Sequence, residues 1–267
     1  MHHPIEHFPE DRELEQALAL LRVAQRVTVL TGAGVSAESG VPTFRGAGGL
    51  WEGHRIEDVA TPRAFRRDPG LVWRFYNLRR ASVWKVQPNP GHFALAEMEQ
   101  RWGADSFAVC TQNVDGLHQQ AGSQHVLELH GSLARVRCTV CEYRADRRGE
   151  DLPPLPSCPQ CGELLRPDIV WFEEMLPADV WERAVEQTAN CECFLVVGTS
   201  GVVYPAAGLI DGARAVGASI IEINLEATAA TGRVDVALHG KSGEILPRLL
   251  AMLKGESGAA ATGGIRA

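Results

Sequence analysis

Four short apolar segments in this chain each run into a glycine-rich or polar sequence, and this repeated pattern constrains the fold more than any other feature. The apolar segments are 27–30, 106–110, 194–197 and 219–223. Runs of this length that end at turn-forming residues are typical of strands buried on both faces of a parallel sheet. Open parallel sheets bind ligands at the carboxyl ends of their strands, so the four polar ends predict one shared pocket. We therefore expect an α/β fold.

The tail, 255–267, is rich in small and polar residues that bury little apolar area, so we expect it to be disordered.

Charge and cysteine usage narrow the class of protein. A formal net charge of -7 argues against general nucleic-acid binding, which needs a basic surface. No apolar run is long enough for a membrane span, and the first residues lack the features of a signal peptide. An odd number of cysteines, 7, suits a reducing compartment. We expect a cytoplasmic protein with neither a membrane nor a direct nucleic-acid partner.

The segment 32–37 fits the G-x-G-x-x-G/A pattern after a strand and before a helix. Such a loop presents backbone N–H groups to a pyrophosphate, although a tight turn without a ligand gives the same pattern. The acidic residue of ordinary dinucleotide-binding domains, about 20 residues further on, has no second strand to follow. The pattern therefore disfavours a standard dehydrogenase.

Two pairs of cysteines predict a zinc site. Cys138 and Cys141 are followed, after 16 residues, by Cys158 and Cys161. Four thiolates at this spacing form a closed tetrahedral shell with no position for an activated water, so the zinc is expected to be structural. The remaining cysteines are expected to be small apolar core residues: Cys110, Cys191 and Cys193.

At full length, the glycine loop 32–45 resembles the signature of the sirtuin family. The segments 111–118, 128–131, 198–200 and 224–226 and the paired cysteines also resemble sirtuin motifs, in the family's order, over about residues 20 to 250. The resemblance implies an NAD-dependent deacylase, in which nicotinamide leaves and the acyl group of a protein lysine ends on ADP-ribose.

The resemblance also implies two domains with a cleft between them. A discontinuous Rossmann-like NAD-binding domain is expected from residues 1–45, 105–132 and 190–254. A small helical and zinc-binding domain is expected from residues 46–104 and 133–175.

The resemblance also implies roles for individual residues. His130 is the expected general base, because imidazole titrates near neutral pH, although a lone histidine is more often structural. Asn113 is the second expected catalytic residue and, with Asp115, forms the nicotinamide pocket. The expected cofactor-binding residues are Gly32, Ala33, Gly34, Glu38, Thr43, Phe44, Arg45, Gln112, Asn113, Asp115, Gly198, Thr199, Ser200, Asn224, Leu225, Glu226 and Ser242.

The expected substrate is an acylated lysine in a protein or peptide. Val170, Trp171 and Phe172 resemble the strand that pairs with substrate backbone, and a plain buried strand gives the same pattern. Tyr76 and Arg79, with Ala60 upstream, match the acyl pocket of class III, the bacterial desuccinylase- and demalonylase-like sirtuins. A guanidinium can pair bidentately with a carboxylate, so succinyl, malonyl and glutaryl groups are expected besides acetyl.

Two other functions remain open at this stage. The same NAD pocket could serve a mono-ADP-ribosyltransferase, which would leave labelled adenylate on protein instead of free O-acyl-ADP-ribose. A non-catalytic zinc-ribbon binding module would not be stabilised by NAD against thermal unfolding. The intact motif around Asn113, Asp115 and His130 makes the binding module the least favoured of the three.

Overall fold

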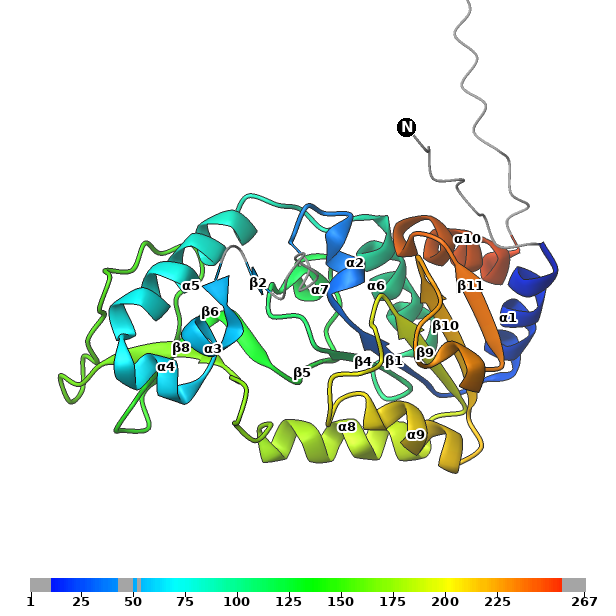
Figure 1. Ribbon diagram of the computed structural model, residues 1–267. Coiled ribbons are helices and arrows are strands. Elements are labelled where there is room, and N and C mark those ends of the chain that lie inside the picture. The colour runs from blue at the N-terminus through cyan, green and yellow to red at the C-terminus, as the bar shows by residue number, and fades with distance from the viewer. Residues whose placement is uncertain (1–10, 43–49, 52–53, 256–267) are drawn as a thin grey trace, which may run out of the picture.

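The computed structural model describes residues 11–42, 50–51 and 54–255 (Figure 1). Its largest element is a six-stranded sheet of order β11-β10-β9-β1-β4-β5, in which every described pairing is parallel. The strands are β1 (Val27–Thr31), β4 (Phe107–Thr111), β5 (Val126–Glu128), β9 (Cys193–Val197), β10 (Ser219–Asn224) and β11 (Val236–His239). The predicted α/β fold with a Rossmann-like sheet is confirmed.

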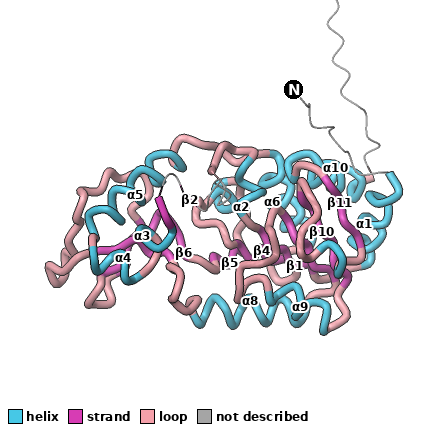
Figure 2. Tube along the Cα trace, in the orientation of Figure 1, coloured by secondary structure: helices cyan, strands magenta, loops and turns pink. Residues whose placement is uncertain are grey.

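Helices cover both faces of this sheet, and the tube in Figure 2 shows the two layers. One face packs on α1 (Asp11–Val23), α6 (Pro90–Trp102) and α10 (Ser242–Lys254), and the other on α8 (Ala178–Asn190) and α9 (Gly208–Ala215). Side chains along a strand alternate between the faces: in β9, Leu195 joins the first layer and Phe194 the second. None of the described helices is both long and apolar enough to cross a membrane.

A smaller module lies beside the sheet and has its own core (Figure 1). It contains an antiparallel sheet of order β7-β6-β8, built from β6 (Gly131–Cys138), β7 (Arg144–Asp146) and β8 (Leu165–Ile169). The helices α3 (Ile56–Val59), α4 (Pro62–Arg67) and α5 (Pro69–Val83) pack against it. Two further strands, β2 (Leu50–Trp51) and β3 (His54–Arg55), form a short antiparallel pair.

The packing of α6 differs from the expected division of the chain. The expectation assigned residues 46–104 to the small module, yet Leu95 and Met98 of α6 are fully buried in the core of the large sheet. The helix also makes extensive contact with α10. The helical part of the small module is therefore residues 56–83, and the chain returns to the large domain before α6 begins.

The order of the strands places a ligand crevice between β1 and β9. From β1 the chain proceeds to β4 and β5 on one side, whereas β9, β10 and β11 extend the sheet on the other side. The helix that follows β9 covers one face, and α6, which precedes β4, covers the opposite face. Loops that leave neighbouring strands toward opposite faces open a crevice at the carboxyl edge of the sheet.

Candidate active site

The glycine loop after β1 packs directly against the loop after β9. Gly34 N donates to Gly198 O at 2.8 Å, and Gly32 N donates to Val197 O at 3.1 Å. A Cβ atom on Gly34 would lie 2.8 Å from the Cα and the carbonyl oxygen of Gly198. The glycines are thus required by the close approach of two backbone segments. From the sequence, glycines were expected here because their backbone N–H groups would contact a pyrophosphate.

The side chain of Asn113 is buried at the carboxyl end of β4 and ties this strand to the glycine loop. Its Nδ2 donates to Gly32 O at 3.0 Å and to Ser36 Oγ at 3.1 Å. Ser36 lies in α2 (Ala33–Ala37), which begins within the glycine loop. The two amide hydrogens of Asn113 therefore fix its orientation, and its Oδ1 atom remains the acceptor for a ligand.

Asp115 is also buried, and its Oδ1 accepts a hydrogen bond of 2.9 Å from the backbone of Leu117. Leu117 begins α7 (Leu117–Gln120). Burial raises the pKa of Asp115, and the hydrogen bond from Leu117 counteracts this only in part. Asp115 thus places a second buried hydrogen-bonding group two residues from Asn113.

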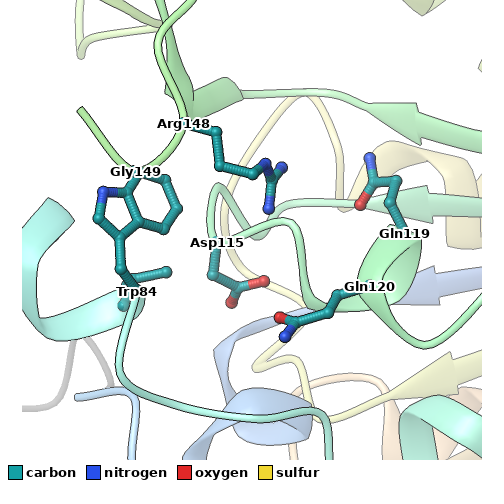
Figure 3. Close-up of a pocket in the computed structure, with 7 residues that line it drawn as sticks. Trp84, Asp115, Gln119, Gln120, Arg148 and Gly149 are labelled. Carbon is teal, nitrogen blue, oxygen red and sulfur yellow. The ribbon is translucent and has the colours of Figure 1, made fainter.

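A cavity of about 550 Å³ opens beside Asp115 (Figure 3). The Arg148 guanidinium lies 5.6 Å from the ring of Trp84 and beside Gly116. The residues that line the cavity are Val83, Trp84, Asp115, Gln119, Gln120, Arg148 and Gly149. Because these residues come from the end of α5, from the segment 115–120 that includes α7 and from the loop after β7, the cavity lies between the two domains.

His130 lies between β5 and β6, where the chain passes from the large sheet to the small module. Its Nδ1 is 3.1 Å from Gln112 O, and Gln112 Nε2 donates to Thr199 Oγ1 at 2.9 Å. Burial lowers the pKa of His130, and the hydrogen bond to Gln112 partly opposes this. The imidazole is therefore neutral near pH 7 and can accept a proton.

Two buried histidines, His118 and His92, support the strand ends around the site. His118 Nε2 lies 2.9 Å from Thr31 Oγ1, which donates to Thr111 Oγ1 at 2.8 Å. The ring of His92 lies 4.9 Å from that of His118 and its Nε2 faces Ser36 Oγ at 3.4 Å. His92 and Ser36 are 56 residues apart, and no local pattern signals their contact.

The remaining strand ends form the opposite side of the crevice. Asn224 Nδ2 donates to Thr199 O at 2.8 Å, and the backbone N of Leu225 donates to Asn224 Oδ1 at 3.0 Å. Leu225 and Glu226 are exposed, whereas Ser200 is partly buried. Hydroxyl and amide groups with an exposed carboxylate at this edge suit the ribose and amide groups of NAD.

Glu38 and Ser242 were expected as cofactor contacts, and the structure brings them to each other. Glu38 Oε1 accepts from Ser242 Oγ and from the backbone N of Gly243, both at 2.9 Å. Its carboxylate thus caps the first turn of α10, where the helix dipole favours negative charge. Thr43, Phe44 and Arg45 lie outside the described residues.

The residues expected in the acyl pocket lie together in the small module. Tyr76 is fully buried, its hydroxyl accepts from Trp171 Nε1 at 2.9 Å, and Arg79 is 7% exposed on the same helix, α5. Ala60 is buried, and its carbonyl oxygen accepts from the backbone N of Phe172 at 3.0 Å. These contacts connect α3, α5 and the loop that follows β8.

Residues 170–172, which were expected as a strand, form a loop, and their pairing with substrate backbone stays a prediction. The strand β8 ends at Ile169, and Val170, Trp171 and Phe172 lie in the loop beyond it. The backbone N of Val170 donates to His130 O at 2.9 Å, so the loop lies next to the expected base. Tertiary hydrogen bonds, not a continued ladder, hold this apolar segment.

The four paired cysteines form one cluster in which all ligand atoms lie within 4.8 Å of one another. The sulfurs of Cys138 and Cys161 are 3.4 Å apart, and those of Cys141 and Cys158 are 3.6 Å apart. A tetrahedral zinc–thiolate site, with Zn–S bonds of about 2.3 Å, needs sulfur spacings near these values. The cluster therefore fits one structural zinc ion.

Comparisons with known proteins agree with this geometry. The model of the Sir2 family matches residues 32–205. The chain is 53% identical over 237 residues to NAD-dependent protein deacylase 2 of Pyrobaculum aerophilum, covering 88% of this chain and 94% of that relative. It is 48% identical over 248 residues to the NAD-dependent protein deacylase of Thermococcus kodakarensis, covering 90% and 96%.

Solved structures give the same result. The crystal structure of a Sir2 homologue in complex with NAD matches with a TM-score of 0.85 at 45% identity, covering 96% of this chain and 98% of that chain. Sir2Af2 bound to a myristoylated histone peptide matches with a TM-score of 0.74 at 36% identity, covering 92% and 100%.

Proposed function

We propose, from the premise that this chain belongs to the Sir2 family and is an NAD-dependent protein deacylase, that it removes acidic acyl groups as well as acetyl groups from lysine. The proposal covers succinyl, malonyl and glutaryl groups. The observation that carries it is the burial of Tyr76 and Arg79 within one turn of α5, beside the loop that also holds Phe172. A guanidinium in such a place favours an acyl chain that ends in a carboxylate.

The state of Tyr76 supports this role. Burial raises the pKa of Tyr76 to about 12, so its phenol stays protonated at neutral pH. The hydroxyl oxygen already accepts the indole N–H of Trp171, which leaves the hydroxyl hydrogen as a donor. A carboxylate that reaches this helix would receive a hydrogen bond from Tyr76 and a charged contact from Arg79. An acetyl group can use neither interaction.

We assign the remaining roles by position in the crevice. Bound NAD supplies the ribose that takes up the acyl group while nicotinamide is released. Asn113 and Asp115 would hold the carboxamide of nicotinamide, because both are buried hydrogen-bonding groups next to the glycine loop. The Nε2 atom of His130 would accept the proton of a ribose hydroxyl, since its Nδ1 faces Gln112 O. Thr199, Asn224 and Glu226 would contact the other ribose.

A myristoylated histone peptide is bound in the structure of the relative Sir2Af2, so long acyl chains are a second class to include in the assay. Tyr76 shares an apolar cluster with Phe65 and Phe75, and these surroundings are compatible with an aliphatic chain. The charge of Arg79 favours an acidic chain over a purely aliphatic one. The relative rates on the two classes decide between them.

The test is a panel of peptides with one acylated lysine, with nicotinamide release and O-acyl-ADP-ribose as readouts. We expect succinyl, malonyl or glutaryl peptides to be deacylated at rates comparable with acetyl peptides. Arg79→Met should lower kcat/KM for succinyl peptides by about tenfold or more and change acetyl turnover much less. Equal loss on both peptides would contradict the role of Arg79. Labelled adenylate on protein, without free O-acyl-ADP-ribose, would instead support mono-ADP-ribosyl transfer.

A further inference from the structure

The indole of Trp171 makes its hydrogen bond inward, toward α5. Trp171 is 2% exposed, and its Nε1 donates to Tyr76 Oη at 2.9 Å. An indole N–H can only donate, so the tyrosine oxygen must be the acceptor. The hydroxyl hydrogen of Tyr76 consequently points away from Trp171. Trp171 therefore determines which way Tyr76 can donate.

A guanidinium lies over the ring of the same indole. The Cζ atom of Arg166 is 3.4 Å from the centroid of the Trp171 ring. A cation over the ring is attracted by its electron density, and by polarising the ring it makes the indole N–H a better donor. Arg166 is itself buried on β8, so the stacked arrangement is shielded from water.

The carboxylate of Glu174 bonds both to the guanidinium of Arg166 and to the backbone of the loop at Trp171. Arg166 Nη1 donates to Glu174 Oε1 at 2.6 Å and its Nη2 donates to Glu174 Oε2 at 2.8 Å, a bidentate ion pair. Glu174 Oε2 also accepts from the backbone N of Trp171 at 2.9 Å. Burial alone would raise the pKa of Glu174, but the bonds from Arg166 and Trp171 outweigh it and the pKa is lowered. The carboxylate is therefore charged at neutral pH.

The loop that contains Trp171 and Glu174 requires these stabilising contacts because its backbone is strained. Glu173 has a φ of 75°, and it is the one non-glycine residue with a positive φ in the described part of the chain. A side chain in this region costs about 1 kcal/mol or more, so surrounding contacts must hold it. Glu174 supplies those contacts on one side, and the exposed ion pair between Arg63 and Glu173 adds a weaker one.

We propose that Glu174, Arg166 and Trp171 form a positioning relay that directs the hydroxyl of Tyr76 toward the far end of a substrate acyl group. The relay rests on the acyl specificity proposed above and goes beyond it by naming residues that act without touching the acyl group. Trp171 then acts through its side chain as a positioning residue. The relay connects β8, the strained loop and α5 into one specificity-determining unit.

A double-mutant cycle tests the relay through activity. Trp171→Phe keeps an aromatic ring but removes the N–H, and Tyr76→Phe removes the acceptor. Each single change should lower the ratio of succinyl to acetyl kcat/KM by about tenfold, and the double variant should fall no further. Independent effects would multiply to about 100-fold in the double variant and would overturn the relay.

Arg166→Lys and Glu174→Gln extend the test to the outer members. Both should lower the succinyl-to-acetyl ratio in the wild-type background and leave it unchanged in the Tyr76→Phe background. Arg144→Lys is the matched control, because Arg144 is an exposed arginine of the same antiparallel sheet with no bond to Glu174. A fall in the ratio for Arg144→Lys as large as that for Arg166→Lys would contradict a specific relay.

An NMR measurement separates the relay from the proposed acyl specificity. The indole N–H resonance of Trp171 is assigned by its loss in Trp171→Phe, and we expect it to shift in Tyr76→Phe and in Arg166→Lys. An unmoved resonance in both variants would overturn the relay whatever the substrate preference. If the resonance moves but the wild-type protein leaves succinyl peptides intact, the acyl specificity is wrong and the contact chain stands.

Discussion

The Nδ1 atom of His130 lies 3.1 Å from the carbonyl oxygen of Gln112. A carbonyl oxygen only accepts, so this contact requires the proton on Nδ1 and leaves the lone pair on Nε2. The side chain of the same residue also makes a hydrogen bond: Gln112 Nε2 donates to Thr199 Oγ1 across the crevice. The strand end of β4 thus sets the tautomer of the expected base and links it to the loop after β9.

Replacement of His130 by alanine should therefore abolish most of the deacylation. Loss of a general base lowers turnover by roughly 10²- to 10⁴-fold, and no other titratable side chain is placed at Nε2 by the contacts described here. Acyl-peptide assays measure the loss, and the rise in melting temperature on adding NAD checks that the cofactor site is intact. Deacylation at more than about a tenth of the wild-type rate would exclude His130 as the base.

Gly34→Ala should damage the cofactor crevice. The added Cβ would lie 2.8 Å from backbone atoms of Gly198, so the loops after β1 and β9 would have to separate. Overpacking of this kind costs about 1–3 kcal/mol, and we expect a lower melting temperature and a weaker stabilisation by NAD. Gly232→Ala is the control, because a Cβ there meets no atom within 4 Å. Equal effects of the two changes would contradict the close-packing argument.

The buried histidines predict how stability depends on pH. Burial lowers the pKa of His118 from 6.5 to about 3, with His92 nearby adding to the effect. Burial also lowers the pKa of His92 from 6.5 to about 4. Between pH 6.5 and 4 the unfolded chain binds protons that the native protein does not, so stability falls as the pH is lowered.

Each such histidine contributes about 1.4 kcal/mol per pH unit within this window. We expect His118→Gln, which can still hydrogen-bond to Thr31, to reduce the loss of stability between pH 6.5 and pH 4.5 by roughly 2–3 kcal/mol relative to wild type. Urea unfolding at the two pH values measures this difference. Parallel losses in the two proteins would show that His118 does not remain neutral in the native state.

Local sequence predicted the four central strands because each is a short run of mainly apolar residues that ends at turn-forming residues. The same reasoning failed for Trp171, which lies in an equally apolar segment. There the chain leaves the strand at Ile169 and turns through Glu173, held by Glu174 and Arg166. A bidentate ion pair and an indole hydrogen bond to a helix 95 residues away in sequence are tertiary contacts with no local pattern.

The candidate site shows the same division. Asn113, Asp115 and His130 were predicted from the motifs that contain them, and the structure brings Asn113 to the glycine loop and His130 to Gln112. The support by Ser36 and His92 was not predicted, because it depends on how α6 packs beside α2. The capping of α10 by Glu38 was not predicted either, because this contact becomes visible only when the N-terminus of that helix is placed.

Zinc should stabilise the small module without taking part in the chemistry. Cys141→Ser removes one of the four ligands, so we expect this variant to lose one zinc ion per chain and to melt at a lower temperature. Treatment of the wild-type protein with a strong chelator should have the same two effects. Cys191→Ser is the matched control, because Cys191 lies outside the cluster and its thiol donates to Thr188 O, a bond that serine can keep.

The loss of zinc should affect all substrates alike. Four thiolates close the shell and leave no position for a water or a substrate atom, so removal of zinc should lower the deacylation of acetyl and of acidic acyl peptides by the same factor, in proportion to the fraction of protein that stays folded. Metal analysis and thermal unfolding measure the first effect, and the two peptide assays measure the second. A chelated protein that keeps its melting temperature but loses activity would contradict a purely structural zinc.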